Sequence, residues 1–97
     1  MKLPTVVITK IEMGNDLTKP IQFVGRARRG EYIIKLPYHL NDTTNKELAS
    51  AQYATILQCF HSGKAVIINT IAADTETTPI YTLDSITLDI TDSVSHQ

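Results

Sequence analysis

Hydrophobic and polar positions alternate in several short runs along the chain, and this pattern predicts β-strands. The runs are rich in β-branched residues and are separated by glycine, proline or polar residues. The five predicted strands are Thr5–Met13, Ile21–Val24, Glu31–Leu36, Ala65–Ile71 and Tyr81–Thr91. The fourth is almost continuously apolar, so we expect it to be buried on both faces. In the fifth, Leu83 is out of phase with the alternation that follows, which indicates a bulge near Asp84–Ser85.

Polar and glycine-containing segments connect these strands. Residues 25–30, GRARRG, form a glycine-bounded loop with three arginines, and residues 37–43, PYHLNDT, lead away from the third strand. Turn residues at 14–16 and a polar stretch at 74–79 make two further connections, and the polar tail 92–97 is expected to fray.

One long helix is predicted between the third and fourth strands, over Thr44–Gly63. Thr44 and Glu47 have the spacing of a capping box, in which a hydroxyl and a carboxylate satisfy free amides of the first turn. Gly63 is suited to the left-handed conformation that ends a helix. The sequence therefore marks both ends of this helix.

The predicted helix has one apolar and one polar face. Apolar residues recur at helical spacing and indicate the face that packs on a core. They are Ala49, Tyr53, Ile56, Leu57 and Phe60. The opposite face carries Lys46, Ser50, Gln58 and Ser62. We expect it to meet water or a partner.

Five strands with one helix between the third and fourth is the element order of an OB-fold, a small, partly open barrel. We therefore predict a mainly β (α+β) OB-fold. The 97 residues form a single domain with its core at about residues 5–91.

Composition and motifs favour a binding protein over an enzyme. The formal net charge of −1 gives no overall attraction to nucleic acid or to an anionic membrane. His39, His61 and His96 are isolated from other metal ligands, and no catalytic motif or phosphate-binding glycine loop is present. We expect no catalytic residues, no metal and no cofactor. Cys59, the single cysteine, is expected to act as a small hydrophobic residue.

The arginine loop is the densest candidate for a binding site. A guanidinium pairs in a planar, bidentate way with a carboxylate or a phosphate, so Arg26, Arg28 and Arg29 suit a sugar acid or a nucleic-acid backbone. They also suit a solvated hairpin tip that keeps the sheet edges soluble. Single-strand binding further needs stacking aromatic residues.

Three segments resemble a known family. The opening VVITKIEMGNDLTKPIQF resembles the first two strands of the B subunits of the subtilase cytotoxin and typhoid toxin group, AB5 toxins related to pertussis-like toxins. SAQYATILQCFHSGKAVIINT is similar to that group's helix and fourth strand, and TTPIYTLDSITLDI to its closing strand.

The resemblance implies an OB-fold protomer of a homopentameric ring with the helices around a central pore. Such B subunits catalyse nothing, bind host glycans that are commonly sialylated, and carry a catalytic A subunit. Lys46, Ser50, Gln58 and Ser62 would then line the pore or contact neighbouring copies. The resemblance implies no nucleic acid and no insertion into a membrane. It implies secretion if the chain is a mature form whose signal was removed, whereas Met1 as the native start implies a cytoplasmic protein.

The family's binding residues match this chain only in part. A serine before the first strand, which helps to hold sialic acid, corresponds to Pro4-Thr5, so Thr5 supplies a hydroxyl; a basic residue after the second strand falls near Arg28. A tyrosine used by some members falls near Thr70, so that ring contact is lost. The candidate glycan-binding residues are Thr5, Arg26, Arg28, Arg29 and Thr70.

The sequence also departs from the family at a cysteine pair that links the second and third strands. Phe23 and Ile34 stand at these positions. The alternative to a glycan-binding B subunit is an intracellular OB-fold protein that binds single-stranded nucleic acid through the same arginine loop.

Overall fold

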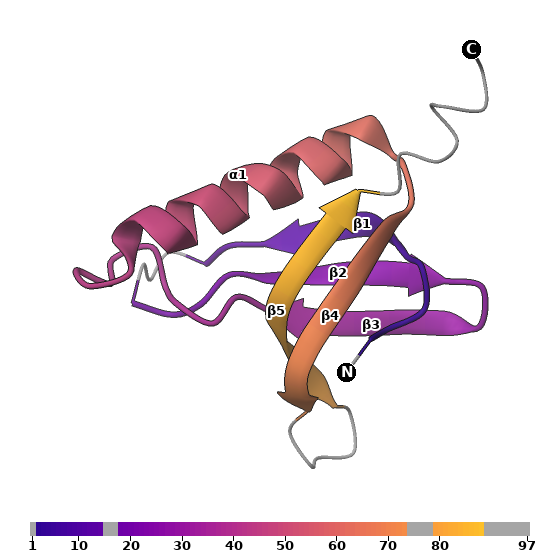
Figure 1. Cartoon of the computed structure of the whole chain (residues 1–97), viewed down its shortest axis with the longest axis horizontal. Helices are drawn as coiled ribbons and strands as arrows, with labels where there is room; N and C mark the ends of the chain where they lie inside the picture. The colour runs from indigo at the N-terminus through magenta and orange to yellow at the C-terminus, as the bar shows by residue number, and fades with distance from the viewer. Residues whose placement is uncertain (1, 15–17, 74–78, 89–97) are drawn as a thin grey trace.

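The chain folds into five strands and one helix in the predicted order (Figure 1). The computed structural model describes residues 2–14, 18–73 and 79–88. The elements are β1 (Val7–Glu12), β2 (Gln22–Ala27), β3 (Gly30–Lys35), α1 (Lys46–Ser62), β4 (Val66–Ala73) and β5 (Ile80–Leu88). The expected turn residues 15–16, the connection at 74–78 and the tail at 92–97 lie outside the described residues.

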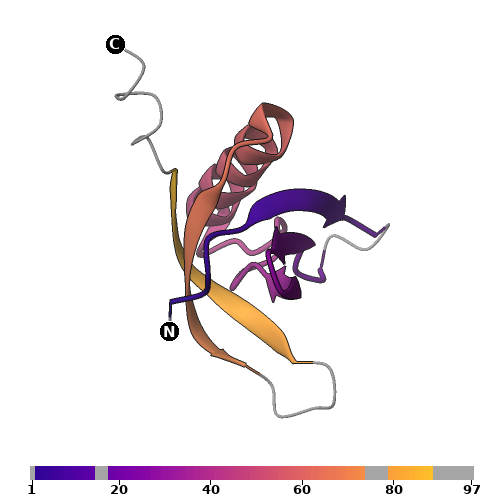
Figure 2. The same ribbon diagram turned by 90° about the vertical axis from the view of Figure 1, so that its right-hand side faces the viewer.

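The strands form one curved sheet in the order β1-β2-β3-β5-β4. Neighbouring strands are antiparallel except β3 and β5, which run parallel with Ile33 opposite Ile80. The N-terminal segment runs beside β4, where Val6 and Val66 exchange backbone hydrogen bonds of 3.1 and 2.7 Å (Figure 2). These contacts bring β1 and β4 together and curl the sheet into the partly open barrel of an OB-fold, as predicted.

The barrel interior is filled by the inward residues of the alternating strands. Phe23 and Ile34 are direct cross-strand partners, and both are fully buried. Apolar packing between these two side chains therefore helps to hold β2 and β3 together.

The expectation that the fourth strand is buried on both faces is wrong. Val66, Ile68 and Thr70 are buried, Ile67 and Asn69 are partly exposed, and Ile71 is 63% exposed. The strand therefore alternates like its neighbours, because only its inner face meets the core.

The bulge predicted in β5 is confirmed. Asn69 lies opposite Ser85, and the next residue of β4, Thr70, lies opposite Leu83, so Asp84 is the extra residue. The bulge restores the phase of the strand, since Leu83 is buried and Ile86 also packs against the core.

One close approach shapes the barrel where the N-terminal segment enters β1. A Cβ atom at Gly25 would lie only 2.8 Å from Cγ2 of Val6. Gly25 pairs with Ile8 in the β1–β2 ladder, so the missing side chain lets Val6 fold over β2 while it also bonds to β4. This glycine therefore permits the curvature of the barrel.

The beginning of the helix differs from the prediction. α1 starts at Lys46 with Asn45 as its N-cap, and the Asn45 side chain makes no capping hydrogen bond. Instead, Oδ1 of Asp42 accepts hydrogen bonds of 2.9 Å from the backbone N–H groups of both Thr44 and Asn45. The Thr44–Glu47 capping box is thus wrong, because the N-cap is Asn45 and the Asp42 carboxylate already bonds the Thr44 N–H that Glu47 would have reached.

The end of the helix and its buried face largely follow the prediction. Gly63 has φ of 66°, and its N–H donates to the carbonyl of Cys59 at 3.2 Å, which confirms the left-handed cap. Ala49, Ile56 and Cys59 are buried, but Phe60 is 37% exposed. Cys59 occupies the inward position that the periodicity gave to Phe60.

Candidate binding surface

The arginines lie on a tight hairpin. Ala27 and Gly30 are the last paired residues of β2 and β3, so Arg28 and Arg29 alone form the turn, and both are exposed. Arg26 belongs to β2 and lies opposite Glu31. The six-residue loop expected for GRARRG is therefore wrong, because β2 continues through Arg26 to Ala27 and β3 begins at Gly30.

Arg26 lies on the outer face of the sheet. Gly25 is buried and Ala27 packs against the core, so the alternation turns Arg26 outward, where it is exposed. Its partner in β1 is Val7 and its partner in β3 is Glu31. This row is the last outward-facing one before the Arg28–Arg29 turn, since the next pair, Ala27 and Gly30, faces the other way.

Thr5 lies at the same end of the sheet as the arginines. It is exposed and stands between Leu3 and Val6, which are buried and hydrogen-bonded to β4. Because Val7 is the partner of Arg26, the residues just before Val7 lie at the end of β1 that faces the turn. The structure thus brings Thr5 to the arginine end of the barrel.

Thr70 does not share this surface. Its exposed fraction is 2%, and it lies in β4 among the inward residues. A ligand on the outside of the barrel does not reach its hydroxyl, so we remove Thr70 from the candidate site. The alternation of β4, hidden in the sequence by its run of apolar residues, decides this point.

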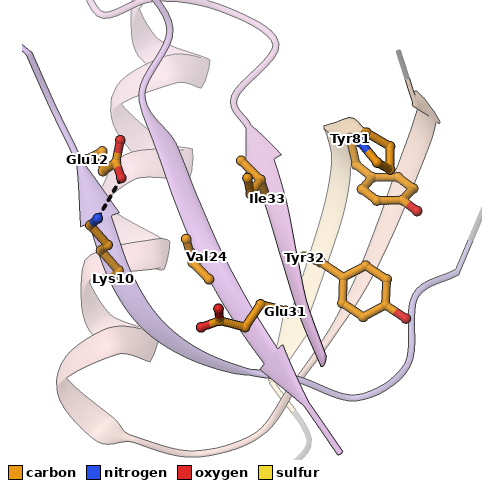
Figure 3. Close-up of a pocket in the computed structure, with 8 residues that line it drawn as sticks. Lys10, Glu12, Val24, Glu31, Tyr32, Ile33 and Tyr81 are labelled. Carbon is orange, nitrogen blue, oxygen red and sulfur yellow. Dashed lines mark ion pairs between the residues drawn. The ribbon is translucent and has the colours of Figure 1, made fainter. Parts of the chain in front are cut away.

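A groove that crosses β1, β2, β3 and the start of β5 was missed by the sequence analysis (Figure 3). It is an open hollow of about 460 Å³. Its lining residues come from β1, β2, β3 and the start of β5, and they are Lys10, Glu12, Val24, Glu31, Tyr32, Ile33, Pro79 and Tyr81. The volume is in the range of small-ligand sites.

Apolar residues form the middle of the groove and charges lie beside them. The register places Val24 opposite both Lys10 and Ile33. Lys10 Nζ is 2.9 Å from Oε1 of Glu12, and in Figure 3 the Glu31 carboxylate extends from β3 toward β2. The pKa of Lys10 is raised, first by its hydrogen bond to Glu12 and then by the negative charges of Glu12 and Glu31.

Two tyrosines mark the other end of the groove. The rings of Tyr32 and Tyr81 are 5.8 Å apart at an interplanar angle of 58°, and both rings are partly buried against the core. They lie where β5 joins β3, and their hydroxyls point away from the ion pair (Figure 3). The groove therefore combines an aromatic end, an apolar middle and a charged end.

The sequence held only part of the signal for this groove. Tyr32 and Tyr81 are 49 positions apart in the sequence and meet only through the parallel β3–β5 pair. Lys10, Val24 and Ile33 share a row only because of a bulge after Ile8. Knowledge of the strand register would have been required to find it.

The described residues contain no other obvious chemistry. Among them, no three His, Cys, Asp or Glu side chains come together to hold a metal ion. No helix in the described part of the chain is long and apolar enough to cross a membrane. Cys59 is buried, and burial raises the pKa of its thiol.

The assembly residues proposed on α1 are all exposed. Lys46, Ser50, Gln58 and Ser62 follow the helix at intervals of four or eight residues and lie on its outer side. Ser62 also donates a 3.0 Å hydrogen bond to the carbonyl of Cys59. We call these four residues the outer stripe of α1.

Neither a scan of protein-family models nor a comparison with curated proteins finds a match to this chain.

Proposed function

We propose that this protein is a non-catalytic, receptor-binding B subunit of an AB5-type toxin. In this proposal five copies form a ring, bind sialylated glycans on host cells and carry an A subunit. The observation that carries the proposal is the exposed Arg28–Arg29 turn, with Arg26 beside it, on an OB-fold barrel. The resemblance implies an OB-fold, and on this fold the exposed arginines are side chains that can pair with a sugar carboxylate.

The two guanidinium groups of the Arg28–Arg29 turn are suited to bind an acidic sugar. A sialic acid carries a carboxylate, and a guanidinium binds a carboxylate through two parallel hydrogen bonds. Both turn arginines are exposed, and Thr5 offers a hydroxyl at the same end of the barrel. The proposed glycan site therefore consists of Thr5, Arg26, Arg28 and Arg29.

The single-stranded nucleic-acid alternative has less support. OB-folds bind single strands on the face that includes β2 and β3, and here Glu12 and Glu31 line the groove of that face. Their charges oppose a phosphate backbone. The two tyrosines stand together at one end of the groove and do not form a row along a strand path.

The binding test is a glycan array probed with the purified protein. We expect sialylated glycans to bind and the same glycans without sialic acid to bind more weakly. Replacement of Arg28 and Arg29 by lysine keeps the charge but removes the planar fork, so affinity should fall at least about tenfold, the value of a charge-assisted hydrogen bond. Lys19→Ala, which removes an exposed charge before the other end of β2, is the control.

Two results would contradict the binding proposal. One is an array with no sialylated hit. The other is tight binding of an oligonucleotide that weakens steeply with salt and depends on the same arginines, since this is the behaviour of the alternative.

The assembly is tested separately by native mass spectrometry. We expect a species of five copies, and a protein that remains a monomer at micromolar concentration removes the ring. Ser50→Arg, in the outer stripe of α1, places like charges where the copies would meet, so it should lower the pentamer fraction.

A further inference from the structure

The groove carries more negative than positive charge. Its lining contains one basic side chain, Lys10, and two acidic ones, Glu12 and Glu31. Lys10 Nζ is 2.9 Å from Oε1 of Glu12, so these two charges are already paired. The Glu31 carboxylate makes no ion pair within the described part of the chain. Glu31 is therefore the charge in the groove that a positively charged ligand can pair with.

An apolar strip on the outer face of the sheet accompanies Glu31. Val24 and Ile33 are cross-strand partners, both are partly exposed, and they alternate along their strands with the fully buried Phe23 and Ile34. Glu31 precedes Ile33 by two positions on β3, so its side chain leaves the same face of the sheet. In Figure 3 its carboxylate extends toward β2, the strand that carries Val24.

The two tyrosines belong to the opposite face. Tyr32 lies opposite the buried Gly25, and Tyr81 lies opposite the fully buried Ile34. Residues that are directly opposite each other in a sheet share a face, so both rings border the groove from the core side. A ligand on the outer face therefore contacts the apolar strip and Glu31.

This arrangement suits the side chain of lysine or arginine. Such a side chain has an apolar stem and a terminal cation, so the stem can pack on Val24 and Ile33 while the cation pairs with Glu31. An anionic side chain would be repelled by Glu31, and a wholly apolar one would take water from its carboxylate without a compensating bond. The groove, at about 460 Å³, is large enough for one basic side chain with its peptide backbone.

The groove and the arginine turn are neighbours along one hairpin. Glu31 lies opposite Arg26, and the turn residue Arg28 follows Arg26 by two positions. At about 3.3 Å per residue, the turn lies roughly 7 Å beyond this row. Arg26 repels a cation on its own side of Glu31, so the ligand cation should lie on the side of Val24. One ligand with both an acidic sugar and a basic side chain can therefore reach both places.

We propose that the groove binds a lysine or arginine side chain of a polypeptide, with the stem on Val24 and Ile33 and the charge at Glu31. This inference rests on the proposed function and specifies its receptor. The receptor is a sialylated glycoprotein with a basic residue near the glycan, and a glycolipid would lack this second contact.

The test uses synthetic peptides with one sialylated glycan on a central threonine. A single lysine is placed in turn at each of the four positions on either side, and matched peptides carry alanine there. Calorimetric titration at low salt measures affinity. We expect at least one lysine peptide to bind about twofold to fivefold more tightly than its alanine counterpart, which is the value of an exposed ion pair.

Two variants should change this preference for lysine in opposite directions. Glu31→Gln removes the partner of the ligand cation, so the preference should disappear. Lys10→Gln removes a competing cation from the groove, so the preference should increase. Both residues are exposed, so both variants should keep the fold, which thermal unfolding checks.

Two controls separate the groove from the arginine turn. Glu47→Gln, on the exposed first turn of α1, removes a carboxylate elsewhere and should leave the preference unchanged. Replacement of Arg28 and Arg29 by lysine should weaken the lysine and alanine peptides equally, because both carry the sialic acid.

The outcomes separate this inference from the proposed function. If no lysine peptide is preferred, or if Glu31→Gln keeps the preference, the basic-residue site is overturned, while binding that depends on the arginines leaves the proposed function standing. If no sialylated peptide binds, the proposed function fails, and NMR with the lysine peptides without glycan then tests the groove. Shifts of the Val24 and Ile33 methyl signals that Glu31→Gln abolishes support the site, and their absence overturns it.

Discussion

Replacement of Gly25 by alanine gives a decisive test of the curvature of the barrel. A methyl group at this position would lie 2.8 Å from Cγ2 and 3.1 Å from Cβ of Val6, whereas carbon atoms prefer separations of about 3.5–4.0 Å. Val6 has little freedom to retreat, because it is 1% exposed and both its N–H and its carbonyl are bonded to Val66. We therefore expect a loss of about 1–3 kcal/mol in the free energy of unfolding, as in other overpacked cores.

The sign of this effect separates two explanations. Considered only as a strand residue, glycine is less favourable than alanine by about 0.5–1 kcal/mol, so the intrinsic preference predicts that Gly25→Ala stabilises the protein. The close approach of Val6 predicts the opposite. Urea unfolding followed by circular dichroism measures the difference through the midpoint, provided that the m-value is unchanged.

A double-mutant cycle with Val6→Ala identifies the atoms involved. Alone, Val6→Ala removes two buried methyl groups, worth about 1.6 kcal/mol, with a further cost for the cavity. In the double variant the alanine methyl at position 25 enters the space left by Val6, so the combined loss should be smaller than the sum by about 1 kcal/mol. A Gly25→Ala protein as stable as the wild type, or losses that simply add, would refute the packing at this crossing.

Two further predictions concern the helix. The pKa of Asp42 is lowered from 3.8, mainly because the Asn45 backbone N–H donates to its carboxylate. The ionised Asp42 carboxylate therefore stabilises the fold above the unfolded-state pKa, and this stabilisation is lost as the pH falls through the folded-state pKa. The unfolding midpoint should fall more between pH 7 and pH 2 for the wild type than for Asp42→Asn. An equal fall in both proteins would contradict a stabilising role for the hydrogen bonds to the Asp42 carboxylate. Burial raises the pKa of Cys59 and hides its sulfur. Iodoacetamide should therefore label the native protein at a rate set by unfolding and the urea-unfolded protein within minutes. Rapid labelling of the native protein would show that Cys59 is not in the core.

Local signals in the sequence were sufficient for the element order and for several details. Gly63 was identified as the helix end because few residues other than glycine adopt a φ of 66°. The bulge at Asp84 was visible because Leu83 and Ile86 can face the same core only if one residue between them is extra. These features depend on residues that are close in sequence, where geometry leaves few solutions.

The errors arose where several residues competed for one role. Residues 42–45, DTTN, are four possible helix caps in a row, and the pattern selected Thr44 because of its spacing to Glu47. In the structure Asn45 is the N-cap, and one carboxylate oxygen of Asp42 bonds the amides of Thr44 and Asn45 just before the helix. Similarly, Cys59 and Phe60 are adjacent at the edge of the helix face, and Cys59 is the one that is buried.

The candidate site was only partly predictable for a different reason. The arginines adjoin one another in sequence, so their cluster was visible, and the tight turn only sharpened its position. The groove depends on register between β1, β2 and β3 and on the parallel contact of β3 with β5. Thr70 was wrongly included in the site, because its exposure depends on which face of β4 meets the core.

The position of the helix relative to the groove makes assembly and recognition compatible. In Figure 3, which looks onto the groove, α1 lies behind the strands, so the groove and the outer stripe of α1 belong to different sides of the barrel. Copies that associate through the outer stripe would therefore leave Glu31 and the tyrosines accessible. The arginine turn projects at the end of the β2–β3 hairpin, away from the body of the helix (Figure 1). The proposed ring formation and the proposed glycan binding would thus use separate residues of this small domain, and a substitution in one surface need not disturb the other.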